Sequence, residues 1–290
     1  MSPGMDMARP ADPHRAANWS LRVALGVFGL IAAIAVLAPL VLPYSSAAGS
    51  LLDRLKPPGT LLRDGTLALL GTDALGRDVL TLAVHGFRTS VLVATLATLC
   101  SCFVGTALGV TAGYLGGWTD AAISRAIDIV LVFPAILLAI VIAGLLGPSL
   151  VNLVIVLVAT RWVVFARIGR ASTLSLRERE WVRGAFVLGV ARPLIIIRHV
   201  LPFLAGPLAT VATLEFAAFV MTEASLSFLG IGLPASTLSL GKTISEGREH
   251  IGQAYWISTY PGLLLVLLVV SIGLVGDNLS ERFVSRRERQ

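Results

Sequence analysis

Residues Arg161 to Pro202 read RWVVFARIGRASTLSLREREWVRGAFVLGVARPLIIIRHVLP. This stretch holds eight arginines against two acids, Glu178 and Glu180, and it lies between two long apolar runs. The pattern of residues 181–189 predicts a short helix with an apolar face, and Pro193 and Pro202 interrupt the sequence that follows. A basic, helical, proline-bounded loop between membrane helices is typical of a docking surface, so we interpret the rest of the chain as the membrane body to which this loop belongs.

The composition indicates an α-helical membrane protein that crosses the bilayer several times. Hydrophobic residues make up 56% of the 290 residues and charged residues only 14%, with a mean hydropathy of +0.84. Soluble domains carry about 25% charged residues. The net charge of +6 does not indicate nucleic-acid binding, because the arginines cluster in loops beside apolar runs, where membrane topology explains them.

The apolar runs predict six membrane helices, since about 20 helical residues cross a hydrocarbon core of about 30 Å. The predicted spans are 21–42, 90–114, 129–146, 150–165, 203–229 and 256–275. The corresponding parts of the chain are a tail (1–20), a first helix (21–43), an external segment (44–88), a core of five helices (89–276) that includes a loop at 166–202, and a second tail (277–290).

Two local features refine these spans. Ser101, Gly105, Gly109 and Gly113 recur every four residues and predict a face on which another helix packs closely. Pro134 predicts a kink in the third span, which follows a short polar connection at 116–128.

The distribution of positive charge predicts the topology. With both termini in the cytoplasm, 16 of the 23 Lys and Arg residues lie on the cytoplasmic side, counting Arg22 at the start of the first span and Arg161 towards the end of the fourth, which satisfies the positive-inside rule. The segments 44–88 and 230–255 are then external.

The sequence predicts no catalytic, metal-binding or cofactor-binding residues. Cys100 and Cys102 lie two apart in an apolar helix, where they cannot face each other, and the four histidines are scattered among loops. The octapeptide STLSLGKT at 236–243 resembles a phosphate-binding loop, but Ser236 replaces its first glycine and no buried strand precedes it.

Four stretches resemble a known family. They are GTDALGRDV at 71–79, GGWTD at 116–120 with Phe133 and Pro134, EASLSFLGIG at 223–232, and the basic loop. Together they resemble the permease of a binding-protein-dependent ABC importer, specifically the second (C-type) permease of oligopeptide, dipeptide and nickel uptake systems. In the loop, Arg183 and Gly184 stand where the family usually has Glu and Ala.

The resemblance implies the type I ABC importer permease fold and a site for coupling to cytoplasmic ATPases. The implied coupling residues are Arg183, Gly184, Ala185, Phe186, Gly189, Arg198, His199 and Pro202. The implied partners are a homologous second permease, two ATP-binding subunits or domains, and an external solute-binding protein. ATP hydrolysis is then the work of the partners, and the expected location is the inner membrane.

Two acids in the fifth span are a second candidate site. A charged side chain inside the bilayer costs at least about 2.5 kcal/mol, so Glu215 and Glu223 are expected to face protein or a water-filled path. Each is a candidate for the translocation path or a subunit contact, and for Glu223 a role in tying local structure together is equally open. The expected function is import of di- and oligopeptides. Import of nickel or glutathione by the same architecture, and a stand-alone secondary transporter that uses both glutamates, are the alternatives.

Overall fold

The computed structural model describes residues 49–180, 182, 184 and 190–287, with four isolated positions earlier in the chain. The side chains of Arg192 and His199, and those after Gly276, are outside this description, as is nearly all of the predicted first span. The elements are η1 (Leu51–Asp53), β1 (Thr60–Leu61), β2 (Leu67–Ala68), α2 (Val79–Leu115), α3 (Gly117–Val132), α4 (Ala135–Leu146), α5 (Leu150–Arg177), α7 (Arg192–Ile195), η2 (Ile196–Val200), α8 (Leu201–Phe228), α9 (Leu240–Arg248) and α10 (Trp256–Arg287).

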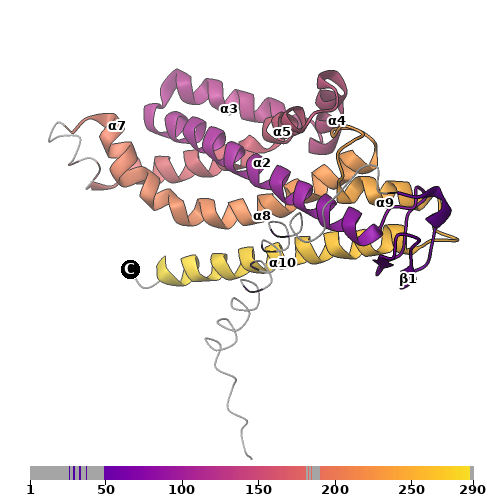
Figure 1. Cartoon of the computed structure of the whole chain (residues 1–290). Coiled ribbons are helices and arrows are strands. Elements are labelled where there is room, and N and C mark those ends of the chain that lie inside the picture. Colours follow the sequence, from indigo (N-terminus) through magenta and orange to yellow (C-terminus); the bar gives the residue numbers. More distant parts are fainter. Residues whose placement is uncertain are drawn as a thin grey trace, which may run out of the picture.

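The long helices form a bundle with two distinct ends (Figure 1). The small hairpin of β1 and β2 lies at one end together with α9, and α7 lies at the other. The C-terminal end of α10 is on the α7 side (Figure 1). The predicted external segments and the predicted cytoplasmic loop are therefore at opposite ends of the molecule.

Within the described ranges, four helices are long and apolar enough to cross a membrane: α2, α5, α8 and the Trp256–Gly276 part of α10. A fifth span is possible if α3 and α4 count as one, although they meet at an angle of 93°. The break falls at Phe133 and Pro134, so the kink predicted at Pro134 is confirmed and is a sharp bend. The count of six helices stays a prediction, because the first span lies outside these ranges.

Several helices extend beyond the ends that the sequence predicted for them. The stretch 116–128 is not a loop, because α3 begins at Gly117. Helix α5 continues twelve residues past the predicted end of its span at Phe165, which makes the first part of the basic stretch helical. Helix α2 begins at Val79, inside the predicted external segment, and α10 continues to Arg287. Each extension is polar enough to leave the bilayer while its backbone hydrogen bonds still favour a helix.

The small-residue face of α2 packs against α5, as predicted. A Cβ atom added at Gly105 would lie 2.3 Å from the carbonyl oxygen of Trp162, and one at Gly113 would lie 2.8 Å from that of Arg170. Ser101, at the start of the series, is fully buried. Glycine is required at these positions because the two backbones are almost in contact.

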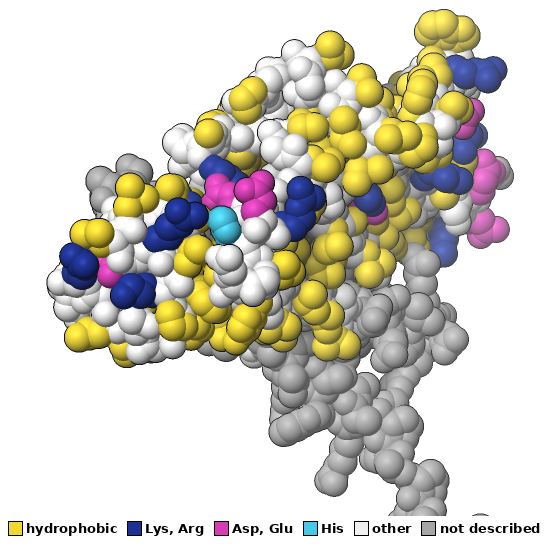
Figure 2. Space-filling model, turned by 90° about the vertical axis from the view of Figure 1, so that its right-hand side faces the viewer, with side chains coloured by type: hydrophobic (Ala, Val, Ile, Leu, Met, Phe, Trp, Pro, Cys, Tyr) yellow, Lys and Arg dark blue, Asp and Glu magenta, His cyan; other side chains and the backbone are white. Residues whose placement is uncertain are grey.

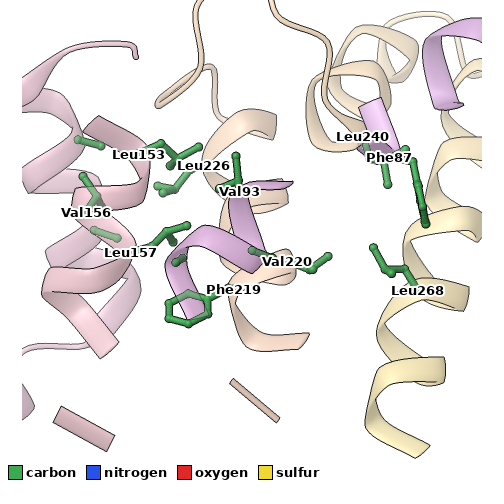
Figure 3. Packing of buried hydrophobic residues seen from close by; sticks show 14 of the residues in the cluster. Phe87, Val93, Leu153, Val156, Leu157, Phe219, Val220, Leu226, Leu240 and Leu268 are labelled. Atoms are coloured by element: carbon green, nitrogen blue, oxygen red, sulfur yellow. The ribbon is translucent and has the colours of Figure 1, made fainter. Parts of the chain in front are cut away.

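The core lies where α2, α5, α8 and α10 meet (Figure 3). Leu153 and Leu157 of α5 face Phe219 and Leu226 of α8, and Val93 of α2 lies between them (Figure 3). Leu240 of α9 and Leu268 of α10 extend the same cluster. The core thus joins α9 to the membrane helices.

The external segment is tied to the bundle by polar contacts. The Asp78 carboxylate accepts from the backbone N–H of Thr81 at 2.8 Å and caps α2. The indole N–H of the buried Trp256 donates to the carbonyl of Thr72 at 3.1 Å. The segment is therefore a folded cap on the end of the bundle that is predicted to be external.

Candidate coupling segment and intramembrane charges

The predicted coupling segment is attached to the end of α2 by an apolar contact. Val182 is 3% exposed and Ile195 is fully buried, and both pack with Tyr114 in one cluster. In the connection from α5 to α8, residues 178–200, Val182 lies near the start and Ile195 near the end. The two ends of the loop are therefore brought together against the last turn of α2.

Arginines hold the neighbouring helix ends. The Arg177 guanidinium donates to the carbonyl oxygens of Gly113 and Tyr114 at 3.5 and 3.3 Å, which satisfies carbonyls at the C-terminus of α2. Arg179 stacks over the ring of Phe203 at 5.4 Å, which links the end of α5 to the start of α8. These contacts fix both ends of the loop, where it leaves α5 and where it enters α8.

An ion pair fixes α3 to α5. Arg170 donates to both carboxylate oxygens of Asp120, with Nη2 2.7 Å from Oδ2 and Nε bonded to Oδ1. This two-point geometry suits the planar guanidinium. It joins the start of α3 to α5 about two turns before Arg177.

The loop leads into α8 without a break in the helix. α7, the π-helical turn η2 and α8 follow one another directly from Arg192 to Phe228. Arg198 on the π turn is exposed, and Pro202 is exposed in the first turn of α8, where proline is tolerated. A movement of the loop would therefore be transmitted directly to the membrane helix α8.

The remaining loop predictions fall mostly on residues that the structure does not describe. Gly184 is helical and exposed, and no atom lies within 4 Å of the position that a Cβ atom would occupy there. Arg183, Ala185, Phe186, Gly189 and the His199 side chain lie outside the described residues, so their coupling role stays a prediction.

Glu223 is enclosed by this chain. Its side chain is fully buried and accepts hydrogen bonds from Ser90 of α2 at 2.6 Å and from Ser227 of α8 at 2.7 Å. The Ser239 hydroxyl, at the start of α9, is a further donor. These contacts favour the interpretation that Glu223 ties three helices together.

Glu215 is paired with an arginine from another helix. Arg161 Nη1 lies 3.1 Å from Glu215 Oε2, and the side chains are 27% and 11% exposed. The sequence interpretation counted Arg161 with the basic stretch and also within the predicted span 150–165; the second assignment is right, because Arg161 lies in the middle of α5. The one signal in the sequence is its position inside an otherwise apolar run, VIVLVATRWVVFA.

The external end carries a charged groove. Arg77 bonds to Asp73 at 2.6 Å and reaches Glu246 of α9 at 3.0 Å, so the segments before α2 and around α9 are joined. A cavity of about 350 Å³ lies between them, lined partly by Glu249 and His250. Figure 2 shows acidic side chains beside a histidine, with Lys and Arg side chains around them, on this face of the molecule.

Residues 105–289 match the family of inner-membrane components of binding-protein-dependent transport systems. The chain belongs to this family. The match covers α5, the coupling segment and α8, so the resemblance stated from the motifs is confirmed.

Relatives extend the match over almost the whole chain. The dipeptide transport system permease protein DppC of Alkalihalophilus pseudofirmus is 37% identical over 285 residues, covering 96% of this chain and 92% of the relative. The oligopeptide transport system permease protein OppC of Mycobacterium bovis is 35% identical over 270 residues, covering 92% and 89%.

A solved structure supports the fold. The inward-facing MetNI methionine ABC transporter contains a chain that superposes with a TM-score of 0.58 at 20% identity, covering 70% of this chain and 96% of that one. The importer-type permease fold is thereby confirmed for this chain. As a member of the family with several apolar helices, the chain is an inner-membrane, multi-pass protein.

Proposed function

We propose that the chain is one of two homologous permease subunits in an ATP-driven importer of di- and oligopeptides. The observation that carries this proposal is the match to dipeptide and oligopeptide permeases at 34–37% identity over most of the chain. In this role the subunit forms half of the translocation path and carries out no chemistry of its own.

The coupling segment would pass the movement of the ATPases to the membrane helices. Val182, Ile195 and Tyr114 hold the base of the loop, while Arg198 and Pro202 are exposed beside it. Since η2 continues directly into α8, a rigid-body shift of the docked loop reaches the membrane helix that carries both glutamates. The partners would be two ATP-binding subunits or domains on the cytoplasmic side, where both termini also lie.

The opposite end would receive the solute-binding protein. The segments 44–88 and 230–255, which the sequence predicts to be external, would dock it, and their described parts meet at the Arg77–Glu246 ion pair. The groove beside that pair offers charged groups of both signs, which suits electrostatic docking of a soluble protein.

Co-purification tests the proposal. The tagged chain, taken from native membranes in mild detergent, should recover a second permease and nucleotide-binding subunits, and the complex should import peptide in liposomes only with ATP. Val182→Asp places a charge in the buried cluster at the base of the loop, so it should reduce peptide-stimulated ATP hydrolysis and uptake together, as should Gly189→Asp. Val182→Ile, which keeps the contact apolar, is the matched control.

The opposite result would favour the secondary-transporter alternative. A chain that purifies alone and carries solute in liposomes without ATP would contradict the proposal and would leave Glu215 and Glu223 as ion-coupling groups. ATP-dependent uptake of nickel or glutathione but not of peptides would retain the importer and contradict its proposed substrate.

A further inference from the structure

The ion pair between Arg161 and Glu215 lies near the middle of the two helices that carry it. Arg161 is the twelfth residue of α5, about 17 Å from the first at 1.5 Å per residue, and Glu215 is about 21 Å from the first residue of α8. The two helices enter from opposite ends of the bundle (Figure 1). The pair therefore lies about 17 Å from one end and about 21 Å from the other, near the middle of the length that the two helices share.

The pair is incompletely satisfied. A guanidinium has five N–H donors, and in the described part of the chain only one of those of Arg161 is used, from Nη1 to Glu215 Oε2. The arginine side chain is 27% exposed, more than twice the 11% of its partner. The partly exposed arginine side chain therefore forms an open side of the pair, with donors that no described group uses.

The open side does not suit lipid. A charged group with unused donors is costly against hydrocarbon, whereas it is stable beside water or an anion. Glu223, eight residues further along α8, shows the contrast, because its carboxylate is fully buried and bonded to serines. Of the two acids predicted as candidates for the translocation path, only Glu215 belongs to an ion pair whose arginine side chain is partly exposed.

We propose that Arg161 lies on the wall of the solute path and receives a carboxylate of the passing peptide, while Glu215 orients its guanidinium. This inference rests on the proposed peptide import. A guanidinium fits a carboxylate through two parallel hydrogen bonds, and every peptide with a free C-terminus carries such a group. The Glu215 contact uses one donor of Arg161 and leaves others for the solute.

Thiol labelling of the reconstituted complex tests the position of Arg161. Cys100 and Cys102 are first replaced by Ala, and Arg161→Cys or Phe103→Cys is then added. Phe103 is a depth-matched control, since it is 76% exposed and lies on α2 two residues before Gly105, which meets the carbonyl of Trp162. A membrane-impermeant, negatively charged methanethiosulfonate should label position 161 several-fold faster than position 103, and peptide-loaded binding protein with ATP should slow it.

Transport by charge variants tests the contact itself. Arg161→Gln should lower peptide uptake about tenfold, the equivalent of one charged hydrogen bond, while ATP hydrolysis stimulated by the loaded binding protein is retained. Arg161→Lys should retain part of the uptake, and Glu215→Gln, which keeps the cation, should reduce uptake less than Arg161→Gln.

Three results would overturn the inference. They are equal labelling at positions 103 and 161, normal uptake by Arg161→Gln, and equal losses of uptake and ATP hydrolysis in the Arg161 and Glu215 variants, which would indicate a purely structural or inter-subunit pair. The wild-type complex is measured in the same vesicles. If it takes up no peptide, the proposed function fails; if it does, the three results above concern the role of Arg161 alone.

Discussion

Gly109 of α2 lies directly against the backbone of Ala166 in α5. A Cβ atom at Gly109 would be 2.2 Å from the carbonyl oxygen of Ala166 and 2.9 Å from its Cα, so there is no room for one unless a helix moves. Gly105 and Gly113 make the same kind of contact one turn to either side. These three contacts bring α5, which carries Arg161, Arg170 and Arg177, to a fixed depth against α2.

Replacing Gly109 should therefore separate the two helices. Gly109→Ala is expected to destabilise the chain by about 1–3 kcal/mol, the usual effect of overpacking, because both obstructing atoms belong to backbone. Gly144→Ala in α4 is the control, since nothing lies within 4 Å of its Cβ position and alanine favours a helix. Thermal unfolding in detergent compares the two variants, and an equal midpoint for both would contradict this account of the interface.

Loss of the buried carboxylate at Glu223 should loosen three helices. Glu223→Ala leaves the hydroxyls of Ser90 and Ser227 without their acceptor, at an expected cost of about 1–3 kcal/mol. Ser225→Ala, on the exposed side of the same helix, removes only a bond to the carbonyl of Met221 and should be nearly neutral. A melting temperature of Glu223→Ala equal to that of Ser225→Ala would show that the serine contacts contribute little.

Arg77 should control how firmly the external cap is held. Arg77→Gln removes the ion pairs to Asp73 and Glu246, which join the segment before α2 to α9. We expect faster limited proteolysis of residues 49–78 and weaker stimulation of ATP hydrolysis by the binding protein. Arg63→Gln, an exposed change in the same segment, is the control. Unchanged proteolysis in Arg77→Gln would mean that Trp256 and the backbone bonds suffice to hold the cap.

Arg170 should not be replaceable by lysine. A lysine can keep the charge but not the two-point contact with Asp120, so Arg170→Lys should cost about 1 kcal/mol; partial exposure of the pair limits the loss. Arg167→Lys is the matched control, because Arg167 is exposed on the same helix. Chemical denaturation of both variants in detergent measures the difference, and equal stability would refute a specific role for the guanidinium.

Local patterns in the sequence predicted the features that depend on local geometry. The four-residue spacing of small residues predicted the α2–α5 interface, and Pro134 predicted the bend between α3 and α4. The ends of the helices were not predictable from hydropathy. Apolar character ends at the membrane surface, while the backbone of α5 stays helical as far as Arg177.

The partners of the charged residues could not be predicted from the sequence either. Glu215 was identified as a candidate, but its partner Arg161 is 54 residues away, and Arg77 and Glu246 are 169 apart. Such pairs depend on how whole helices are placed side by side, and no local pattern encodes that. Around Glu223, Ser227 is a local partner four residues along the same helix, whereas Ser90 is 133 residues away on α2 and could not be predicted for the same reason.

The π-helical turn at Ile196–Val200 fixes an angle between two parts of the molecule. A π turn accommodates one more residue than an α turn, and each residue of an α-helix corresponds to about 100° of rotation about the axis. The π turn absorbs its extra residue within one turn, so deleting one residue here would restore an α turn and rotate the loop relative to α8 far less than the roughly 100° that a deletion elsewhere in α8 would cause. The turn therefore lets the connection before α8 be one residue longer without changing the direction in which the loop points.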